Sequence, residues 1–352
     1  MLTIIIIRRN VGPVINNRFV LTALAAVASL TMVGCTPTGG SADGAAAGDL
    51  KVVATTTQVA DLTRNVVGDT AGVVVTQLIQ PNQSAHSYDP SVADLTALGE
   101  ADVLVINGVG LEEWLDDAIS ASGFDGVTID SDEGIEIQDI AAGEEDHADD
   151  KAATDDAEHS HQGGNPHIWT DVSNAETMAV TIATGLSDAQ PDLAPDVEAN
   201  ATAYTGRLAE LDDWIRTNID AVPAEQRLLV SNHDAFGYFT EAYGITYVGS
   251  IIPSFDDNAE PSAAAIDELV DAITATGVKA VFSEASISPK AADTIAGEAG
   301  VSVYSGEDAL YSDSLGARHS DGATYISSQL HNVGLILESW GAEPTAVPAD
   351  LR

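Results

Sequence analysis

The chain has 352 residues, 45% of them hydrophobic, which is enough for two lobes that each bury a core. Its formal net charge is −42, from 55 acidic and 13 basic residues. This balance excludes nucleic acid as a partner, because phosphate binding needs a basic face. It favours a surface of solvated carboxylates and is compatible with a cationic ligand. The single cysteine excludes a disulfide within one chain.

The first 34 residues have the pattern of a secretory signal peptide. Three arginines precede an apolar run over residues 19–33 that is too short for a membrane span. Cys35 follows directly, and this junction resembles a bacterial lipobox, in which the cysteine carries a lipid. Residues 35–49, rich in Gly, Ala, Ser and Thr, are expected to form a flexible tether. We therefore expect an extracytoplasmic protein, lipid-anchored to the outer face of the cell membrane.

The next part of the chain alternates strand patterns with helix patterns. The strand patterns are short and apolar, and the helix patterns repeat apolar residues at spacings of three and four. Such alternation predicts a largely parallel sheet with helices on both faces. We expect strands over residues 50–57, 73–79, 101–107 and 127–129, and helices over residues 58–67, 89–98 and 111–121.

Residues 139–164 interrupt this alternation. They are rich in carboxylates, contain His147, His159 and His161, and have no sizeable apolar run. The composition predicts an exposed loop. One interpretation is a solvated insertion. The other is an accessory metal-binding loop, because clustered histidines and carboxylates bind borderline cations, and composition leaves both open.

A long helix pattern over residues 195–219 lies near the middle of the chain that remains after the signal peptide. Its apolar residues recur at spacings of three and four, so one face should be buried along its whole length. We expect a linking helix within residues 191–222. It would join an N-terminal βα lobe over residues 50–190 to a C-terminal βα lobe over residues 223–352.

The strand and helix alternation returns after this long helix. Strands are expected over residues 227–231, 246–251, 278–283 and 301–304, and helices over residues 235–243, 261–276, 288–297 and 323–340, while a further helix over residues 173–186 precedes the long one. The predicted fold class is therefore α/β, with two parallel-sheet βα lobes joined by a long spine helix. Ligands of such sheets bind outside the carboxyl ends of the strands, which places a site in the cleft between the lobes.

Three histidines occupy suitable places for that site. His86 and His233 each follow a predicted strand near its carboxyl end, and His167 lies behind Pro166 in the segment that leaves the first lobe. Facing lobes would put His86 and His167 on one wall and His233 on the other. Asp313, in the loop after the last strand, could add a carboxylate to the second wall. Three imidazoles and one carboxylate suit Zn²⁺, whereas Mn²⁺ usually prefers more oxygen.

Longer motifs occur in a consistent order along residues 50–340. They are VVATTT at 52–57, IQP at 79–81 with HSYDP at 86–90, ADVLVING at 101–108 with LEEWL at 111–115, NPHIW at 165–169, NHDAFGYF at 232–239, FSE at 282–284 and SDSL at 312–315. In these motifs the chain resembles the periplasmic or lipid-anchored solute-binding subunits of zinc and manganese ABC importers. The resemblance covers nearly the whole chain after the tether.

The resemblance implies a function of metal capture and delivery to an importer permease, without enzymatic activity, by a monomeric chain. It implies that the metal ligands are His86, His167, His233 and Asp313. Relatives that prefer manganese commonly have Glu in place of His233, so the histidine favours zinc.

The chain departs from the family pattern next to two of these ligands. Asn165 stands where the family often has Asp, and Ser84 with Ala85 replaces the usual Asp-Pro before His86. These positions support the ligands and do not bind the metal themselves. The departures therefore bear on the affinity for the metal and not on the identity of the ligands.

Three other functions are alternatives. The same site could carry Mn²⁺ or another divalent metal in the same transport role. A zinc hydrolase could use Glu284 as a general base, although the chain has no His-Glu-x-x-His motif and Asp313 would fill the open position that a catalytic zinc needs. A surface adhesin is the third alternative, since lipid-anchored relatives are often described that way.

Overall fold

The computed structural model describes residues 49–139 and 164–352. The predicted signal peptide, Cys35 and the tether lie outside the described residues. The histidines of the predicted accessory loop, His147, His159 and His161, also lie outside them. The described residues belong to one compact unit.

The N-terminal lobe is built on a parallel sheet with the strand order β2-β1-β3-β4. The strands are β1 (Leu50–Ala54), β2 (Val73–Gln77), β3 (Val103–Ile106) and β4 (Val127–Asp130). The helices between them are α1 (Thr57–Val67), α2 (Val92–Gly99) and α3 (Leu115–Ser122). The β1 and β3 strands are apolar on both faces because helices cover both sides of the sheet, as expected for parallel strands.

The C-terminal lobe also alternates parallel strands with helices, but its strands form two separate pairs. Strand β5 (Leu228–His233) pairs in parallel with β6 (Thr246–Ile252), and β7 (Ala280–Phe282) pairs in parallel with β8 (Ser302–Tyr304). The helices of this lobe are α6 (Gly237–Tyr243), α7 (Ala263–Thr276), α8 (Lys290–Ala299) and α9 (Tyr325–Ser339). The second lobe therefore has two parallel strand pairs among its described residues.

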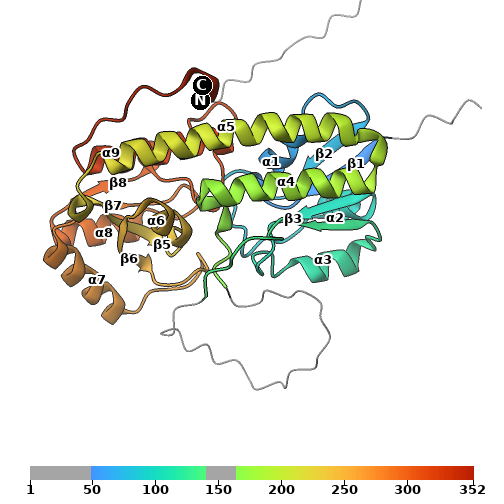
Figure 1. The fold of residues 1–352 in the computed structure, drawn as a ribbon. Helices are drawn as coiled ribbons and strands as arrows, with labels where there is room; N and C mark the ends of the chain where they lie inside the picture. The colour runs from blue at the N-terminus through green and yellow to red at the C-terminus, as the bar shows by residue number, and fades with distance from the viewer. Residues whose placement is uncertain (1–48, 140–163) are drawn as a thin grey trace, which may run out of the picture. The chain divides into compact units, whose positions relative to one another are not determined.

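Two long helices, α4 (Val172–Ala189) and α5 (Ala194–Asp220), run side by side. The longer one, α5, extends over both lobes, while α4 lies over the N-terminal lobe (Figure 1). Helix α5 has 27 residues and is therefore about 40 Å long. Val197, Leu208 and Ile215 on its inner face are fully buried in a core that contains side chains from both lobes. Because of this shared core, α5 is a stiff connection between the lobes. The predicted α/β fold class, with two βα lobes joined by a long helix, is confirmed.

The boundaries differ from the predicted ones at two informative places. The helix expected from residue 89 begins at Val92, because Ser91 caps it by accepting a hydrogen bond from the Asp94 backbone N–H. Strand β5 extends beyond Ser231 and ends at His233. The imidazole of His233 is therefore held on a strand, which is a more rigid support than a loop.

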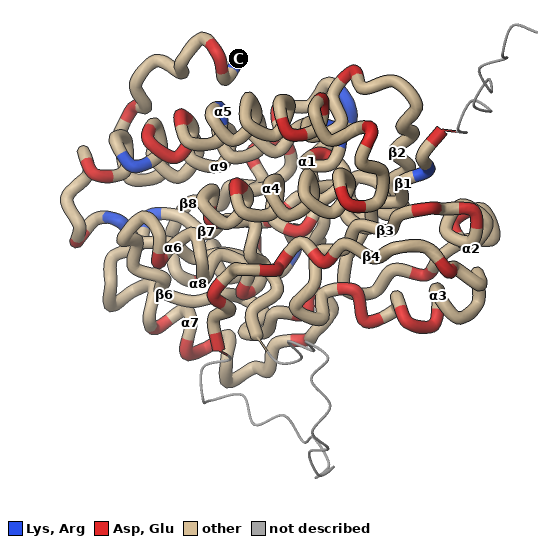
Figure 2. The backbone as a smooth tube through the Cα atoms, turned by 45° about the vertical axis from the view of Figure 1, so that its right-hand side comes forward, with Lys and Arg blue, Asp and Glu red and all other residues tan. Residues whose placement is uncertain are grey.

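The acidic residues are spread over helices and loops of both lobes, and basic residues are few (Figure 2). This distribution fits a solvated acidic surface. Within the part of the chain that the structure describes, no helix is both long enough and apolar enough to cross a bilayer.

Candidate metal centre

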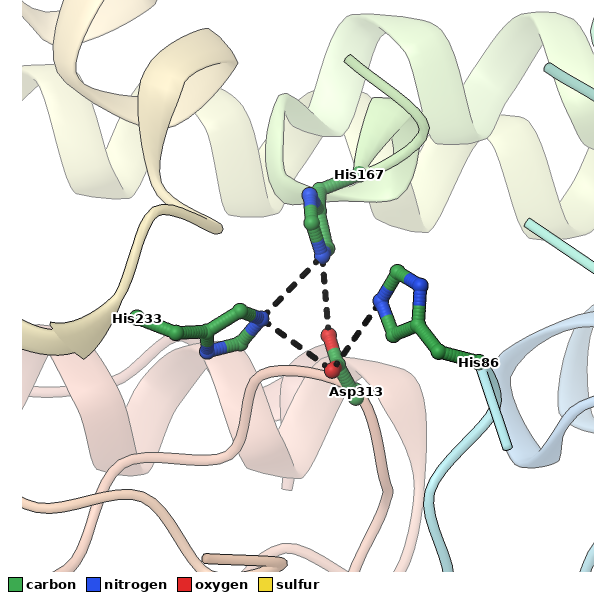
Figure 3. Close-up of side chains that lie close together, drawn as sticks. All are labelled: His86, His167, His233 and Asp313. Atoms are coloured by element: carbon green, nitrogen blue, oxygen red, sulfur yellow. Dashed lines mark hydrogen bonds and ion pairs between the residues drawn. The ribbon is translucent and has the colours of Figure 1, made fainter. Parts of the chain in front are cut away.

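Four side chains from distant parts of the sequence meet where the two lobes face each other (Figure 3). They are His86, His167, His233 and Asp313, and each offers one nitrogen or oxygen atom within 4.8 Å of the others. His167, His233 and Asp313 are fully buried, while the side chain of His86 is 10% exposed. The structure thus brings together all four residues that the sequence indicated.

Asp313 lies at the centre of this cluster. Its Oδ1 is 3.2 Å from His167 Nε2, and its Oδ2 is 3.1 Å from His233 Nε2 and 3.5 Å from His86 Nε2. The Nε2 atoms of His167 and His233 are 3.2 Å apart. All three imidazoles therefore turn the same ring nitrogen toward one carboxylate.

Glu284 orients His233. Its Oε1 accepts hydrogen bonds from the backbone N–H groups of Asn232 and His233, at 2.9 and 2.8 Å. Its Oε2 lies 2.5 Å from His233 Nδ1 and also accepts a hydrogen bond from the Ser312 hydroxyl. A carboxylate on Nδ1 fixes that nitrogen as the protonated one and leaves Nε2 free for a cation. Glu284 is therefore engaged on all sides and is not placed as the free general base of a hydrolase.

Asn165 orients His167 in a similar way. Its Oδ1 accepts a hydrogen bond from the His167 backbone N–H at 3.1 Å and lies 2.8 Å from His167 Nδ1. Its Nδ2 donates to Gln138 Oε1 at 3.1 Å, so the amide is held in one orientation. Asn165 thus supports the imidazole with a neutral oxygen where the family often has a carboxylate.

The loop that carries His86 is held by Asp257, which bonds to Ser84 in that loop. Asp257 was not identified from the sequence as a supporting residue. Ser84 Oγ accepts a hydrogen bond from the His86 backbone N–H at 3.2 Å and donates one to Asp257 Oδ1 at 2.8 Å. Asp257 is 173 positions away, in the loop after β6, and is almost fully buried. Its surroundings in the sequence, SFDDNA, are typical of a solvated turn and gave no signal for this role.

The electrostatics of the cluster are dominated by the Asp313 carboxylate. Burial acts to raise the pKa of Asp313, but the charges of His233 and His167 hold it well below its usual value. Burial lowers the pKa of His167 to about 4. Burial would also lower the pKa values of His233 and His86, yet their contacts with Asp313 outweigh it and raise both. The site therefore favours positive charge beside Asp313, which a metal ion can supply in place of protons.

The donor atoms fit a metal ion. Both oxygens of Asp313 and Nε2 of His86 are buried without a hydrogen-bond partner among the described residues. Buried polar atoms normally have such partners, and their absence is expected where a cation binds. Three imidazole nitrogens and a carboxylate form the N/O ligand set typical of borderline divalent metals.

The fold and this cluster together define a class: an α/β binding protein with two lobes, a long connecting helix and a buried His/Asp metal site between the lobes. The family model described as "Zinc-uptake complex component A periplasmic" matches residues 52–339. The chain belongs to this family, the ZnuA family of metal-binding solute-binding proteins of ABC importers. Members of this family bind and transfer a solute, so the chain is not an enzyme.

The names of individual relatives refer to different metals. The chain is 32% identical over 316 residues to the manganese-binding lipoprotein MntA of Halalkalibacterium halodurans, with 90% of this chain and 95% of the relative covered. It is 30% identical over 319 residues to the zinc-binding protein TroA of Treponema pallidum, with 89% and 96% covered. The solved structure of TroA superposes with a TM-score of 0.72 and 26% identity, over 83% of this chain and 99% of that chain.

Proposed function

We propose that this protein captures Zn²⁺ outside the cytoplasm and delivers it to the permease of an ABC importer. The proposed ligands are Nε2 of His86, His167 and His233, with the carboxylate of Asp313. The observation that carries the proposal is the convergence of these donors around a buried carboxylate that lacks hydrogen-bond partners among the described residues.

The ligand set supports zinc over manganese. Zinc sites are commonly four-coordinate with histidine and carboxylate ligands, and three imidazoles with one carboxylate complete such a shell. Manganese favours sites richer in oxygen. The names of the relatives point both ways, since MntA is called manganese-binding and TroA zinc-binding. Manganese in the same transport role is therefore the second candidate.

The surroundings of the ligands support tight capture. Asn165 and Glu284 hold the Nδ1 atoms of His167 and His233, so the two imidazoles need little reorientation when the metal arrives. Burial excludes water that would compete for the cation. Because α5 connects the two lobes through a shared core, lobe motion should be small, and release should depend on docking to the permease.

The proposal extends to the organisation of the whole chain. Residues 1–34 would be removed as a signal peptide, Cys35 would carry the lipid, and residues 35–49 would tether the protein to the outer face of the membrane. Residues 50–190 and 223–352 would move as the two lobes, with 191–222 as the link, and the protein would act as a monomer.

The decisive experiment is metal analysis of the purified protein from residue 36 onward, followed by calorimetric competition between Zn²⁺ and Mn²⁺. We expect one Zn²⁺ per chain and displacement of Mn²⁺ by Zn²⁺. His167→Ala should abolish stoichiometric binding, whereas His319→Asn, a change at an exposed histidine, should not. Preferential binding of Mn²⁺ would favour the second candidate. Unchanged binding by His167→Ala would refute the proposed site.

A further inference from the structure

The segment that carries Asp313 passes from one lobe to the other. Before Asp313 it is bonded to the C-terminal lobe: the Leu310 N–H donates to Ser283 O at 2.9 Å, and the Tyr311 N–H donates to Asn332 Oδ1 at 2.8 Å. The Ser312 hydroxyl still bonds to Glu284 of the C-terminal lobe, but from the Ser312 carbonyl onward the bonds to other segments reach the N-terminal half. Asp313 therefore lies at the crossing point.

The first two residues of α1 hold the chain on both sides of Asp313. Gln58 Nε2 donates to Ser312 O at 2.7 Å, and the Leu315 N–H donates to Thr57 Oγ1 at 2.8 Å. Thr57 Oγ1 in turn donates to Gln58 Oε1 at 2.8 Å, which links the two anchors. Both side chains are almost completely buried. Thr57 and Gln58 thus form one hydrogen-bonded pair that fixes the backbone around the carboxylate.

Further bonds tie the same segment to the N-terminal half. Trp169 Nε1 donates to Ser312 O at 3.1 Å, and the Asn82 N–H donates to Ser314 Oγ at 2.8 Å. Beyond the loop, the Tyr325 N–H donates to Asp61 Oδ2 at 2.9 Å, which attaches the start of α9 to α1. The part of the chain from the Ser312 carbonyl to the start of α9 is therefore anchored to the N-terminal half at both ends.

His233, unlike Asp313, is attached to the C-terminal lobe. It is the last residue of β5, its backbone N–H donates to Glu284 Oε1 at 2.8 Å, and its Nδ1 lies 2.5 Å from Glu284 Oε2. Glu284 follows β7 in the C-terminal lobe. The support of His233 thus comes from the C-terminal lobe.

We propose that Thr57 and Gln58 are positioning residues that hold Asp313 on the N-terminal wall of the site, so that His86, His167 and Asp313 form a preassembled three-ligand half-site. His233 then completes the site alone from the C-terminal lobe. This arrangement differs from the two-and-two division of ligands that the sequence predicts. The inference rests on the proposed metal-binding function.

The half-site has a mechanical consequence. A small separation of the lobes lengthens the distance to His233 first and leaves the other three ligands around the cation. Affinity then depends on how firmly the α1 residues hold the Asp313 loop, even though neither residue touches the cation. This dependence can be measured in the purified protein.

The test uses variants that keep side-chain volume and remove only hydrogen-bonding groups. Gln58→Met removes the donor to Ser312 O, and Thr57→Val removes the acceptor for the Leu315 N–H. Thr57→Ser keeps the hydroxyl. Thr63→Val is the matched control, since Thr63 lies on the same buried helix and, among the described residues, its hydroxyl bonds to Val59 O alone. Zn²⁺ affinity is measured by competition with a chromophoric chelator, and folding by thermal unfolding of the metal-free protein.

We expect Gln58→Met and Thr57→Val each to weaken Zn²⁺ binding on the order of three- to ten-fold, the effect of losing one buried hydrogen bond. Thr57→Ser should recover most of the affinity, and Thr63→Val should match the wild type. The absorption spectrum of bound Co²⁺ should change in Gln58→Met but not in Thr63→Val, because the carboxylate ligand is displaced.

A double-mutant cycle shows whether Gln58 acts through Asp313. In an Asp313→Asn background, Gln58→Met should weaken binding by much less than it does in the wild type. An equal effect in both backgrounds, or wild-type affinity and an unchanged Co²⁺ spectrum in Gln58→Met, would overturn the inference. Failure of the wild-type protein to bind any metal would instead refute the proposed function, so the two failures are distinguishable.

Discussion

The hydroxyl of Ser84 donates a hydrogen bond of 2.8 Å to the carboxylate of Asp257 and thereby joins the His86 loop to the opposite lobe. His86 is the one cluster member whose side chain is partly exposed, so it lies on the solvent side of the site. The bond therefore connects the two lobes at the side from which a cation would approach. It is a direct contact between a loop that carries a ligand and the lobe that supplies His233.

Ser84→Ala tests this connection. The substitution removes both the acceptor for the His86 N–H and the donor to Asp257. We expect Zn²⁺ affinity to fall on the order of three- to ten-fold, mainly through faster dissociation, measured by stopped-flow transfer to a chelator. Ser87→Ala, at the exposed neighbouring serine, should leave the rate unchanged. Equal dissociation rates for both variants would contradict a role of the Ser84 hydroxyl.

Glu284→Gln should weaken metal binding more strongly. The amide can still accept from the backbone N–H groups, but it loses the charge that faces His233 Nδ1. Replacement of such supporting groups commonly lowers metal affinity by about 10- to 100-fold. Calorimetric titration with Zn²⁺ measures the loss. Glu225→Gln, at an exposed glutamate, serves as the control, and an affinity loss as small as that of the control would exclude the orienting role.

Asp130 provides a pH test that is independent of the metal. Burial, together with the charge of Asp132, raises the pKa of Asp130 from 3.8 to about 7. Between pH 4 and 7 the folded state therefore holds a proton that the unfolded state has lost, and the free energy of unfolding falls as the pH rises through this range.

Asp130→Asn should remove that dependence, because an amide oxygen can still accept the bond from the Asp132 N–H without carrying charge. We expect the metal-free variant to unfold on the order of 2 °C above the wild type at pH 8 and at the same temperature at pH 4. Calorimetric unfolding curves at the two pH values give the comparison. A shift of the same size at both pH values would show that the carboxylate charge is not the cause.

Metal removal should lower thermal stability. A ligand that binds only the folded state at 100 times its dissociation constant adds about 2.7 kcal/mol to the free energy of unfolding. We expect zinc to raise the unfolding temperature of the wild type, a chelator to reverse this, and neither to affect His167→Ala. A zinc-induced shift retained in His167→Ala would place the bound ion elsewhere in the protein.

Much of the site could be predicted because its ligands follow rules of position. His86 and His233 were identifiable at the carboxyl ends of predicted strands, where parallel sheets bind ligands. His167 stood out in the NPHIW motif behind a proline, and Asp313 was suggested by its place after the last strand and by the SDSL motif. The structure brings these four residues together. Their role as metal ligands is a proposal that the experiments above test.

The supporting residues could not be predicted because their partners are distant in the sequence. Gln58 lies in the first turn of a helix whose sequence has no feature that marks a supporting role. Its partner Ser312 is 254 positions away. Asp257 lies in a polar turn, is almost fully buried and accepts a hydrogen bond from Ser84, which is 173 positions away. The attachment of the Asp313 loop to the N-terminal half also escaped prediction, since strand and helix patterns do not report which lobe a loop contacts.

The order of the ligands along the chain has a consequence for biogenesis. A chain exported unfolded and N-terminus first, behind the signal peptide proposed above, would bring His86 and His167 across the membrane early and residue 313 only near the end. Because α1 and the Asp313 segment bond to each other across more than 250 positions, the four-ligand site of such a chain would not form before translocation is almost complete. The finished site would thus arise only outside the cytoplasm, and the protein would take up its cargo there instead of removing metal from the cell that makes it.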